Sequence, residues 1–144
     1  MNGGTLIPAT VRAQYEALFV SPSGLPGCAL LIDRLHVALL RSHRLNRQVA
    51  VLAFTHIEHE ADLGAVADRL RKKLRPDDTI AQPIDATLVV VCNDIADEEA
   101  LDTIRNRLLD AIGIDCLEHD VLSMAGAGAQ ELVEHVLSRA HVAG

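Results

Sequence analysis

The stretch from Leu74 to Asn93 places the strongest limits on how this chain can fold. Leu74-Arg75-Pro76 ends a helix, because proline cannot continue a helix and favours an extended residue before it. Residues 79 to 82 are predicted to form a short strand, and the valine-rich run from Leu88 to Cys92 is typical of a strand buried on both faces. Pro83 to Ala86 must reverse the chain between them, so the sequence predicts a hairpin that follows a helix.

The rest of the chain alternates strand and helix patterns. Residues 48 to 54 are almost continuously apolar and predict a second buried strand. Apolar residues at helical spacing predict helices, which we place at residues 28 to 45, 61 to 74, 97 to 112 and 130 to 140. One or both of the segments 114 to 117 and 121 to 124 are expected to be short strands, joined near Glu118 to Asp120. Periodicity alone therefore indicates a mixed α/β class.

The composition excludes several classes of protein. The chain has 144 residues, of which 49% are hydrophobic and 23% are charged, and this suits one domain with its own core. A net charge of -7 argues against a general nucleic-acid binder, whose surface is basic. No apolar run reaches the roughly 18 residues of a membrane span, and residues 1 to 8 lack the pattern of a secretory signal. Three scattered cysteines indicate buried thiols in a reducing compartment, so we expect a cytoplasmic protein. We also expect no cofactor.

Two segments resemble GGDEF domains, the domains of diguanylate cyclases. Leu74 to Cys92 resembles the segment that contains the family's signature hairpin, and Ser23 to Leu35 resembles its "LTGLPNR" opening. The resemblance implies an α/β (α+β) fold of the GGDEF and nucleotide-cyclase type, with a central, mainly antiparallel sheet surrounded by helices. It also implies an N-terminal segment and helix at residues 1 to 20, and a single degenerate GGDEF-like domain at residues 21 to 144.

The signature of the family is largely missing from the hairpin. Its five positions fall on Ile84, Asp85, Ala86, Thr87 and Leu88. Only Leu88 keeps the apolar character of the family's last position. Glycines in the family's turn can adopt positive φ and approach phosphate closely, whereas Ile84 is β-branched and Pro83 has no N–H donor. We expect Asp85 to take the left-handed position of the turn.

The resemblance implies that metal and substrate contacts are also missing. Thr55 stands where the family has a metal-binding aspartate, and Ala86 and Thr87 replace the acidic pair of the hairpin. Gly27 and Cys28 replace an asparagine and an arginine that help to hold the nucleotide. Roughly ten residues that grip guanine in the family are absent after the strand, which fits a short connection. Two divalent ions need several anionic oxygen ligands, so we expect no catalytic residues and no metal site.

Two alternatives remain open for the polar residues nearby. An active diguanylate cyclase, or another nucleotide-handling enzyme, would need non-standard acidic ligands such as Glu58, Asp62 and Asp85. His56 and His59 are either half of a zinc or nickel site or part of a solvated turn, because His-x-x-His needs further ligands to bind metal.

Arg75 and Asp78 match the Arg-x-x-Asp motif that binds the product, cyclic di-GMP, in the resembled family, at the family's distance from Ile84. A guanidinium can grip a phosphate or a guanine edge, and a carboxylate can accept from guanine N–H groups. The alternative is that the positively charged side chains from Arg69 to Arg75 only complement the partial negative charge at the C-terminal end of a helix. The resemblance implies a catalytically inactive GGDEF-like domain that acts as a regulatory or protein-interaction module, with cyclic di-GMP as its ligand.

Tyr15 and Phe19 are two of the three aromatic residues in the chain and lie on one face of a predicted helix over residues 10 to 19. They either dock a protein partner or a second copy of the chain, because aromatic residues often anchor interfaces, or cover the domain's own core.

Overall fold

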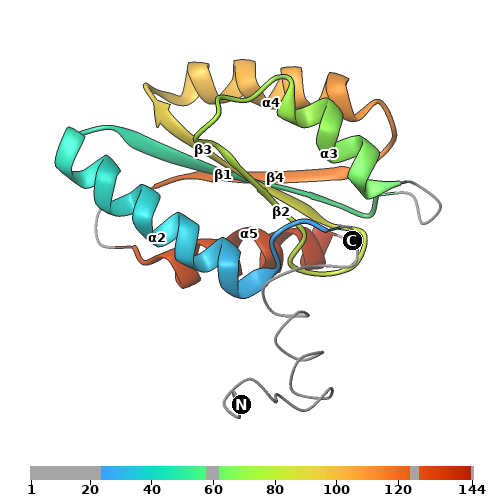
Figure 1. The fold of residues 1–144 in the computed structure, drawn as a ribbon, viewed down its shortest axis with the longest axis horizontal. Coiled ribbons are helices and arrows are strands. Elements are labelled where there is room, and N and C mark those ends of the chain that lie inside the picture. The colour runs from blue at the N-terminus through green and yellow to red at the C-terminus, as the bar shows by residue number, and fades with distance from the viewer. Residues whose placement is uncertain (1–23, 58–61, 124–126, 144) are drawn as a thin grey trace, which may run out of the picture.

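A four-stranded sheet lies between two pairs of helices in the computed structural model (Figure 1), which describes residues 24 to 57, 62 to 123 and 127 to 143. In chain order the elements are α2 (Cys28–Leu45), β1 (Gln48–Thr55), α3 (Leu63–Arg71), β2 (Thr79–Ala81), β3 (Leu88–Ile95), α4 (Glu98–Ile112), β4 (Leu117–Leu122) and α5 (Ala129–Ala143). The helix predicted at residues 10 to 19 lies outside the described residues.

The strands follow the order β2-β3-β1-β4, and each neighbouring pair is antiparallel. β1 and β3 occupy the centre, where Val51 of β1 lies opposite Val91 of β3 and Val121 of β4. Both central strands are almost completely buried, as their apolar runs predicted. The expected fold class, a central antiparallel sheet surrounded by helices, is confirmed.

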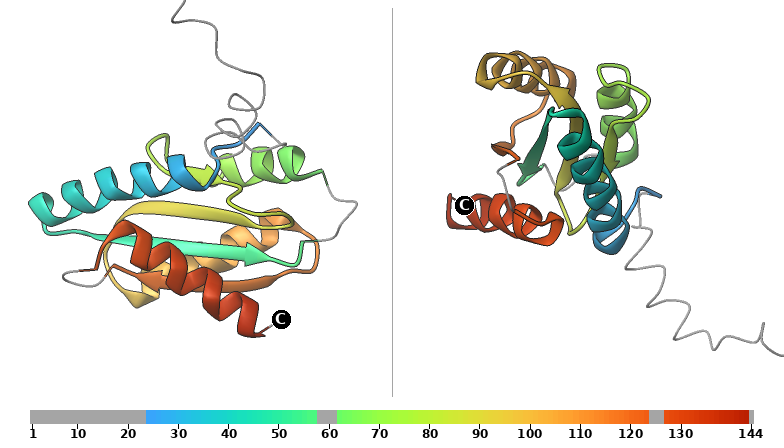
Figure 2. Two further views of the ribbon diagram at one scale, coloured as in Figure 1. Left: turned by 90° about the horizontal axis from the view of Figure 1, so that it is seen from below. Right: turned by 90° about the vertical axis from the view of Figure 1, so that its left-hand side faces the viewer.

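Each face of the sheet supports its own core. Side chains alternate between the faces of a strand, so Leu52 and Phe54 of β1 pack beneath α3 and α4, whereas Val51 and Ala53 pack beneath α2 and α5. The two further views show α2 and α5 together on one side of the sheet (Figure 2). None of the described helices combines an apolar stretch with the length that a membrane crossing needs.

Side-chain caps and left-handed residues define the helix ends. Asp62 accepts a hydrogen bond from the backbone N–H of Ala65 over 3.2 Å, and Asp97 accepts one from that of Ala100 over 2.9 Å. These aspartates are favourable N-caps for α3 and α4. α4 ends at Gly113, whose φ of 70° suits glycine at this position, as the sequence predicted.

Several predicted boundaries differ from the structure; β3 and α5, for example, are longer than predicted. The helix expected at residues 61 to 74 spans only Leu63–Arg71. The two short strands expected between residues 114 and 124 are one strand, β4, and Glu118 to Asp120 lie in its middle instead of joining two strands. Pairing with β1 along the whole of β4 explains this difference, because sheet context overrides the weak strand preference of polar residues.

Candidate functional site

The end of β1 meets the hairpin between β2 and β3 at one end of the sheet. Phe54 of β1 lies opposite Leu88 of β3, and the backbone N–H of Ile57 donates to the carbonyl of Ala86 over 3.1 Å. Thr55 therefore lies beside the turn. The fold thus brings together the positions that the GGDEF resemblance assigns to metal binding.

The side chains at this junction are mostly neutral. Thr55 is buried, and its hydroxyl lies 3.1 Å from Nδ1 of His56. Thr87 is also buried, and its hydroxyl donates to the backbone carbonyl of Asp85 over 3.1 Å. Asp85 supplies the only carboxylate between residues 83 and 88, and it is exposed to solvent.

The turn itself differs from the sequence expectation in one respect. Ala86, with a φ of 55°, is the left-handed residue of the hairpin, and Asp85 is not. The hydrogen bond from the Ile57 N–H to the Ala86 carbonyl ties the turn to the end of β1. It thereby fixes the orientation of the peptide group that follows Ala86. Ile84 projects into solvent with 55% of its surface exposed.

No metal site is formed in the described part of the chain, where no group of three His, Cys, Asp or Glu side chains is placed to hold an ion. His56 lies within this part, but Glu58 and His59 lie outside the described residues. The predicted alternatives of a zinc or nickel site and of non-standard acidic ligands therefore stay predictions.

The start of α2 is tied to the other end of the hairpin. Gly27, which replaces the family's asparagine, is the buried N-cap of α2, and the neighbouring Pro26 carbonyl accepts from the backbone N–H of Gln82 over 2.9 Å. Cys28 is half-buried in the first turn.

Asp78 is buried and forms hydrogen bonds with two segments of backbone. One carboxylate oxygen accepts from the N–H of Arg75 over 3.0 Å, and the other accepts from the N–H of Asn93 over 2.9 Å. Burial raises the pKa of the Asp78 carboxyl, although these two N–H groups partly offset the effect. Asp78 therefore fixes the loop that carries Arg75 against the end of β3.

A cleft of about 400 Å³ opens between α2 and this loop. Arg34 and Arg41 line it from α2, Arg71 lines it from α3, and Asp77 and Asp78 line it from the loop. Asp33 also lines the cleft, so three guanidinium groups and three carboxylates share its wall. Each guanidinium offers a fork of N–H donors that can hold a phosphate or a carboxylate.

Arg41 and Arg75 converge on Asp94 beside the cleft. Their guanidinium groups lie 3.5 and 3.6 Å from one carboxylate oxygen of Asp94, and Arg41 also pairs with Asp77 over 2.7 Å. Arg75 itself does not line the cleft, and 61% of its side chain is exposed. Sequence analysis identified Arg75 and missed Arg41, because the two lie on elements that only the tertiary fold brings together.

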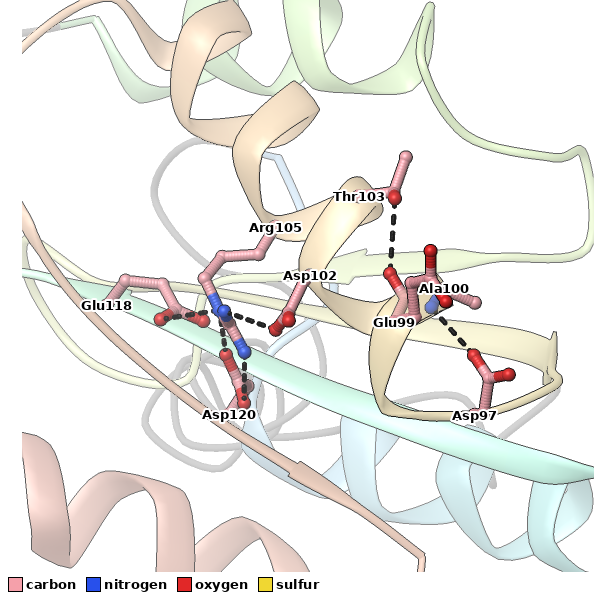
Figure 3. A network of polar contacts seen from close by, with 8 residues as sticks. All are labelled: Asp97, Glu99, Ala100, Asp102, Thr103, Arg105, Glu118 and Asp120. Carbon is pink, nitrogen blue, oxygen red and sulfur yellow. Dashed lines mark hydrogen bonds and ion pairs between the residues drawn. The ribbon is translucent and has the colours of Figure 1, made fainter.

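A second polar network, also missed from the sequence, joins α4 to β4 (Figure 3). Arg105 forms two hydrogen bonds with Asp120, of 2.5 and 3.1 Å, and also pairs with Asp102 and Glu118. One cation thus faces three carboxylates. The signal in the sequence is the alternation of Glu118 and Asp120, which places both side chains on one face of a strand.

The environment of this network shifts the pKa values of the two β4 carboxyls, Glu118 and Asp120, in opposite directions. Burial, the adjacent Asp120 carboxyl and its charge raise the pKa of Glu118 to about 8. Burial opposes ionisation of Asp120 as well, but the hydrogen bonds from Arg105 lower the pKa of Asp120 overall. The Oε2 atom of Glu118 is buried without a hydrogen-bond partner among the described residues. This environment therefore favours the protonated form of Glu118 and the ionised form of Asp120.

The sheet order and helix arrangement define the fold of GGDEF domains. Among solved structures, the GGDEF domain of TpbB (YfiN) of Pseudomonas aeruginosa is 19% identical, with a TM-score of 0.69 over 84% of this chain and 85% of that chain. The GGDEF domain of DgcB of Caulobacter crescentus, in complex with cyclic di-GMP, is 11% identical, with a TM-score of 0.65 over 87% and 89%.

A third similar structure is a microbial GGDEF domain with a described mode of interaction with cyclic di-GMP. It is 13% identical to this chain, with a TM-score of 0.73 over 89% of this chain and 95% of that chain. No protein-family model matches the sequence, and no curated protein matches it. At these identities the structures show the fold that the chain shares with them, and the function is argued from its own residues.

Proposed function

We propose that this chain is a non-catalytic GGDEF-fold domain that acts as a regulatory or protein-interaction module and binds cyclic di-GMP through Arg75 and Asp78. The observation that carries the ligand proposal is the convergence of Arg41 and Arg75 beside a cleft lined by Asp78. Cyclic di-GMP offers two phosphodiester anions and two guanine edges, which match guanidinium and carboxylate groups.

Each residue has a distinct part in this proposal. Arg75 is exposed and can leave its 3.6 Å contact with Asp94 to grip a phosphate or a guanine edge. Arg41 supplies a second cation from α2. Asp78 lines the cleft and holds the loop through two backbone N–H groups, and its two carboxylate oxygens have further acceptor capacity.

Loss of catalysis is supported by the junction of β1 with the hairpin. Thr55, Ala86 and Thr87 offer no carboxylate there, whereas a pair of divalent ions on a triphosphate needs several. Ile84 and Ala86 also occupy positions in the turn where glycine would let the backbone approach phosphate or an acidic side chain would hold a metal ion. These features favour a binding module over a cyclase.

Titration calorimetry with cyclic di-GMP tests the ligand. We expect Arg75→Ala to weaken binding by about tenfold or more, since one charge-assisted contact is worth about 1.5–3 kcal/mol. Arg41→Ala should weaken it by a smaller factor. Arg107→Ala, which alters an exposed arginine of α4, is the matched control. Absence of binding to the unmodified chain, or equal loss in all three variants, would exclude this site.

Asp94→Asn provides a variant with the opposite expected effect. Asp94 competes with the ligand for Arg41 and Arg75, so its neutralisation should strengthen binding by about threefold to tenfold. Asparagine tolerates the left-handed conformation of Asp94, whose φ is 58°. A gain of affinity in Asp94→Asn with a loss in Arg75→Ala would distinguish direct contact from a general change in stability.

Incubation with GTP and magnesium or manganese tests the absence of catalysis. We expect no cyclic di-GMP to form. The alternative, an active cyclase or other nucleotide-handling enzyme with ligands such as Glu58, Asp62 and Asp85, predicts turnover that disappears in Asp85→Ala. The role of Tyr15 and Phe19 in docking a partner stays a prediction, since both lie outside the described residues; Phe19→Ala should reduce partner capture if they dock one.

A further inference from the structure

The side of α2 that faces away from the sheet carries an exposed apolar pair. Val37 and Leu40 are 59% and 60% exposed, whereas Leu31 and Leu35 on the opposite side of α2 are fully buried. No other described helix lies over the outer side of α2 in either view of Figure 2. An apolar pair on a helix that already packs its inner face indicates a second contact surface.

The flanking charges give this surface a self-complementary order. Asp33, Val37, Leu40 and Arg44 follow one another at spacings of four, three and four residues, which is the spacing of a coiled-coil seam. Read in the reverse direction, the seam consists of a basic residue, two apolar residues and an acidic residue. An antiparallel second copy would therefore place Val37 against the partner's Leu40 and Asp33 against the partner's Arg44.

The charges at the two ends of the seam are available for such pairing. Neither Asp33 nor Arg44 forms an ion pair or side-chain hydrogen bond within the described part of the chain, and both are exposed. Arg41, on the flank of the seam, is instead paired with Asp77 and Asp94 of its own chain. The unpaired charges therefore lie at the seam positions where a two-fold partner would supply the opposite charge.

We propose that the outer face of α2, formed by Asp33, Val37, Leu40 and Arg44, joins two copies of this chain in an antiparallel two-fold interface. A two-fold interface requires one surface to complement itself, and the order of these four side chains meets that requirement. The seam is short, so the dimer is weak and exchanges rapidly. This association requires no nucleotide, and its seam borders the proposed ligand site, because Asp33 and Val37 also line the cleft beside Arg41.

Charge reversal with recovery tests the proposal in the full chain. Asp33→Arg and Arg44→Asp each convert two attractive contacts of the dimer into two repulsive ones, and each should weaken self-association by about tenfold or more in sedimentation velocity without nucleotide. The double variant Asp33→Arg/Arg44→Asp restores both contacts with their signs exchanged and should return to within about threefold of the unmodified chain. Asp68→Arg, at an exposed position of α3, is the matched control and should associate like the unmodified chain.

Mixing the two single variants gives a second readout that does not depend on either variant alone. A chain with Asp33→Arg and a chain with Arg44→Asp are complementary at both ends of the seam, so the mixture should form heterodimers although each variant alone is monomeric. Recovery on mixing also shows that both variants are folded. A monomeric unmodified chain at roughly 1 mM, or a dimer that neither reversal weakens, would overturn the proposal.

Discussion

The carboxylate of Asp78 accepts the backbone N–H of Asn93 over 2.9 Å and thereby joins the loop after α3 to the end of β3. The amide of Asn93 returns the link by donating to the backbone carbonyl of Asp77 over 3.0 Å. The second oxygen of Asp78 accepts from Arg75 within the same loop. The residues beside the candidate ligand site are thus held by the core sheet.

We predict that Asp78→Ala lowers the free energy of unfolding by about 2–4 kcal/mol, because two N–H groups lose their acceptor in a buried place. Asp78→Asn keeps one acceptor and should lose about half as much. The measurement is urea unfolding. Asp77→Ala, a neighbouring change at an exposed ion pair, is the control and should lose no more than about 1 kcal/mol. Equal losses at residues 77 and 78 would contradict the structural role of Asp78.

We predict that Ala86→Gly stabilises the protein by about 0.5–1 kcal/mol. The φ of 55° at Ala86 strains a residue with a Cβ, and this strain exceeds the extra unfolded-state entropy of glycine. Thermal or urea unfolding provides the measurement. Ala65→Gly, in the exposed face of α3, should instead destabilise by about 1 kcal/mol. A destabilised Ala86→Gly variant would show that the turn is not left-handed at this residue.

We predict a pH dependence of stability from Glu118. Its carboxyl has a pKa of about 8 in the folded state and 4.5 as its ordinary value, so between these pH values the folded chain holds a proton that the unfolded chain has released. Stability contributed by this group therefore falls as the pH rises from about 4.5 to about 8 and is level above it. Glu118→Gln is neutral throughout and should remove this decline.

The measurement is urea unfolding of the unmodified chain and Glu118→Gln across this range. The variant should be more stable by about 1–3 kcal/mol at pH 9 and nearly equal at pH 5. Asp68→Asn, at an exposed position of α3, should not change the slope. Parallel curves for the unmodified chain and Glu118→Gln would mean that Glu118 is ionised in the fold at neutral pH.

We predict that Arg69→Ala destabilises the protein by about 1–3 kcal/mol. Its guanidinium donates from α3 to the last carbonyls of α4, those of Ala111 and Ile112, over 3.0 and 2.9 Å. These carbonyls lack partners within the helix, so the arginine both caps α4 and joins the two helices. Arg107→Ala, at an exposed arginine without a partner among the described residues, should change stability by less than about 0.5 kcal/mol.

Local rules were sufficient for most of the elements. Gly113 ended α4 as predicted, and continuous apolar runs identified β1 and β3, whereas α3 ends at Arg71, several residues before Pro76. β4 was predicted only in fragments, because Glu118 and Asp120 interrupt its apolar pattern. Both side chains contact Arg105, which approaches from another element and forms hydrogen bonds with Asp120.

The candidate site was only half visible in the sequence. Arg75 and Asp78 could be identified because both lie in one short segment, and a motif defined by spacing can be found in the sequence alone. Arg41 and Asp94 could not, since neither belongs to a motif defined by spacing and the two lie far from each other in the sequence. The 3.5 and 3.6 Å contacts that unite Arg41 and Arg75 at Asp94 arise from the packing of α2 against the sheet.

The sequence by itself determined the class of fold, the position of the hairpin and the presence of a single carboxylate, that of Asp85, in its turn, because hydrophobic periodicity, proline and residue identity act locally. Only the tertiary structure decided which charges meet, which residue of the turn takes the left-handed conformation, and which face of α2 stays uncovered. Electrostatic interactions depend on distance in space, and a linear chain does not show that distance until the sheet has aligned its strands.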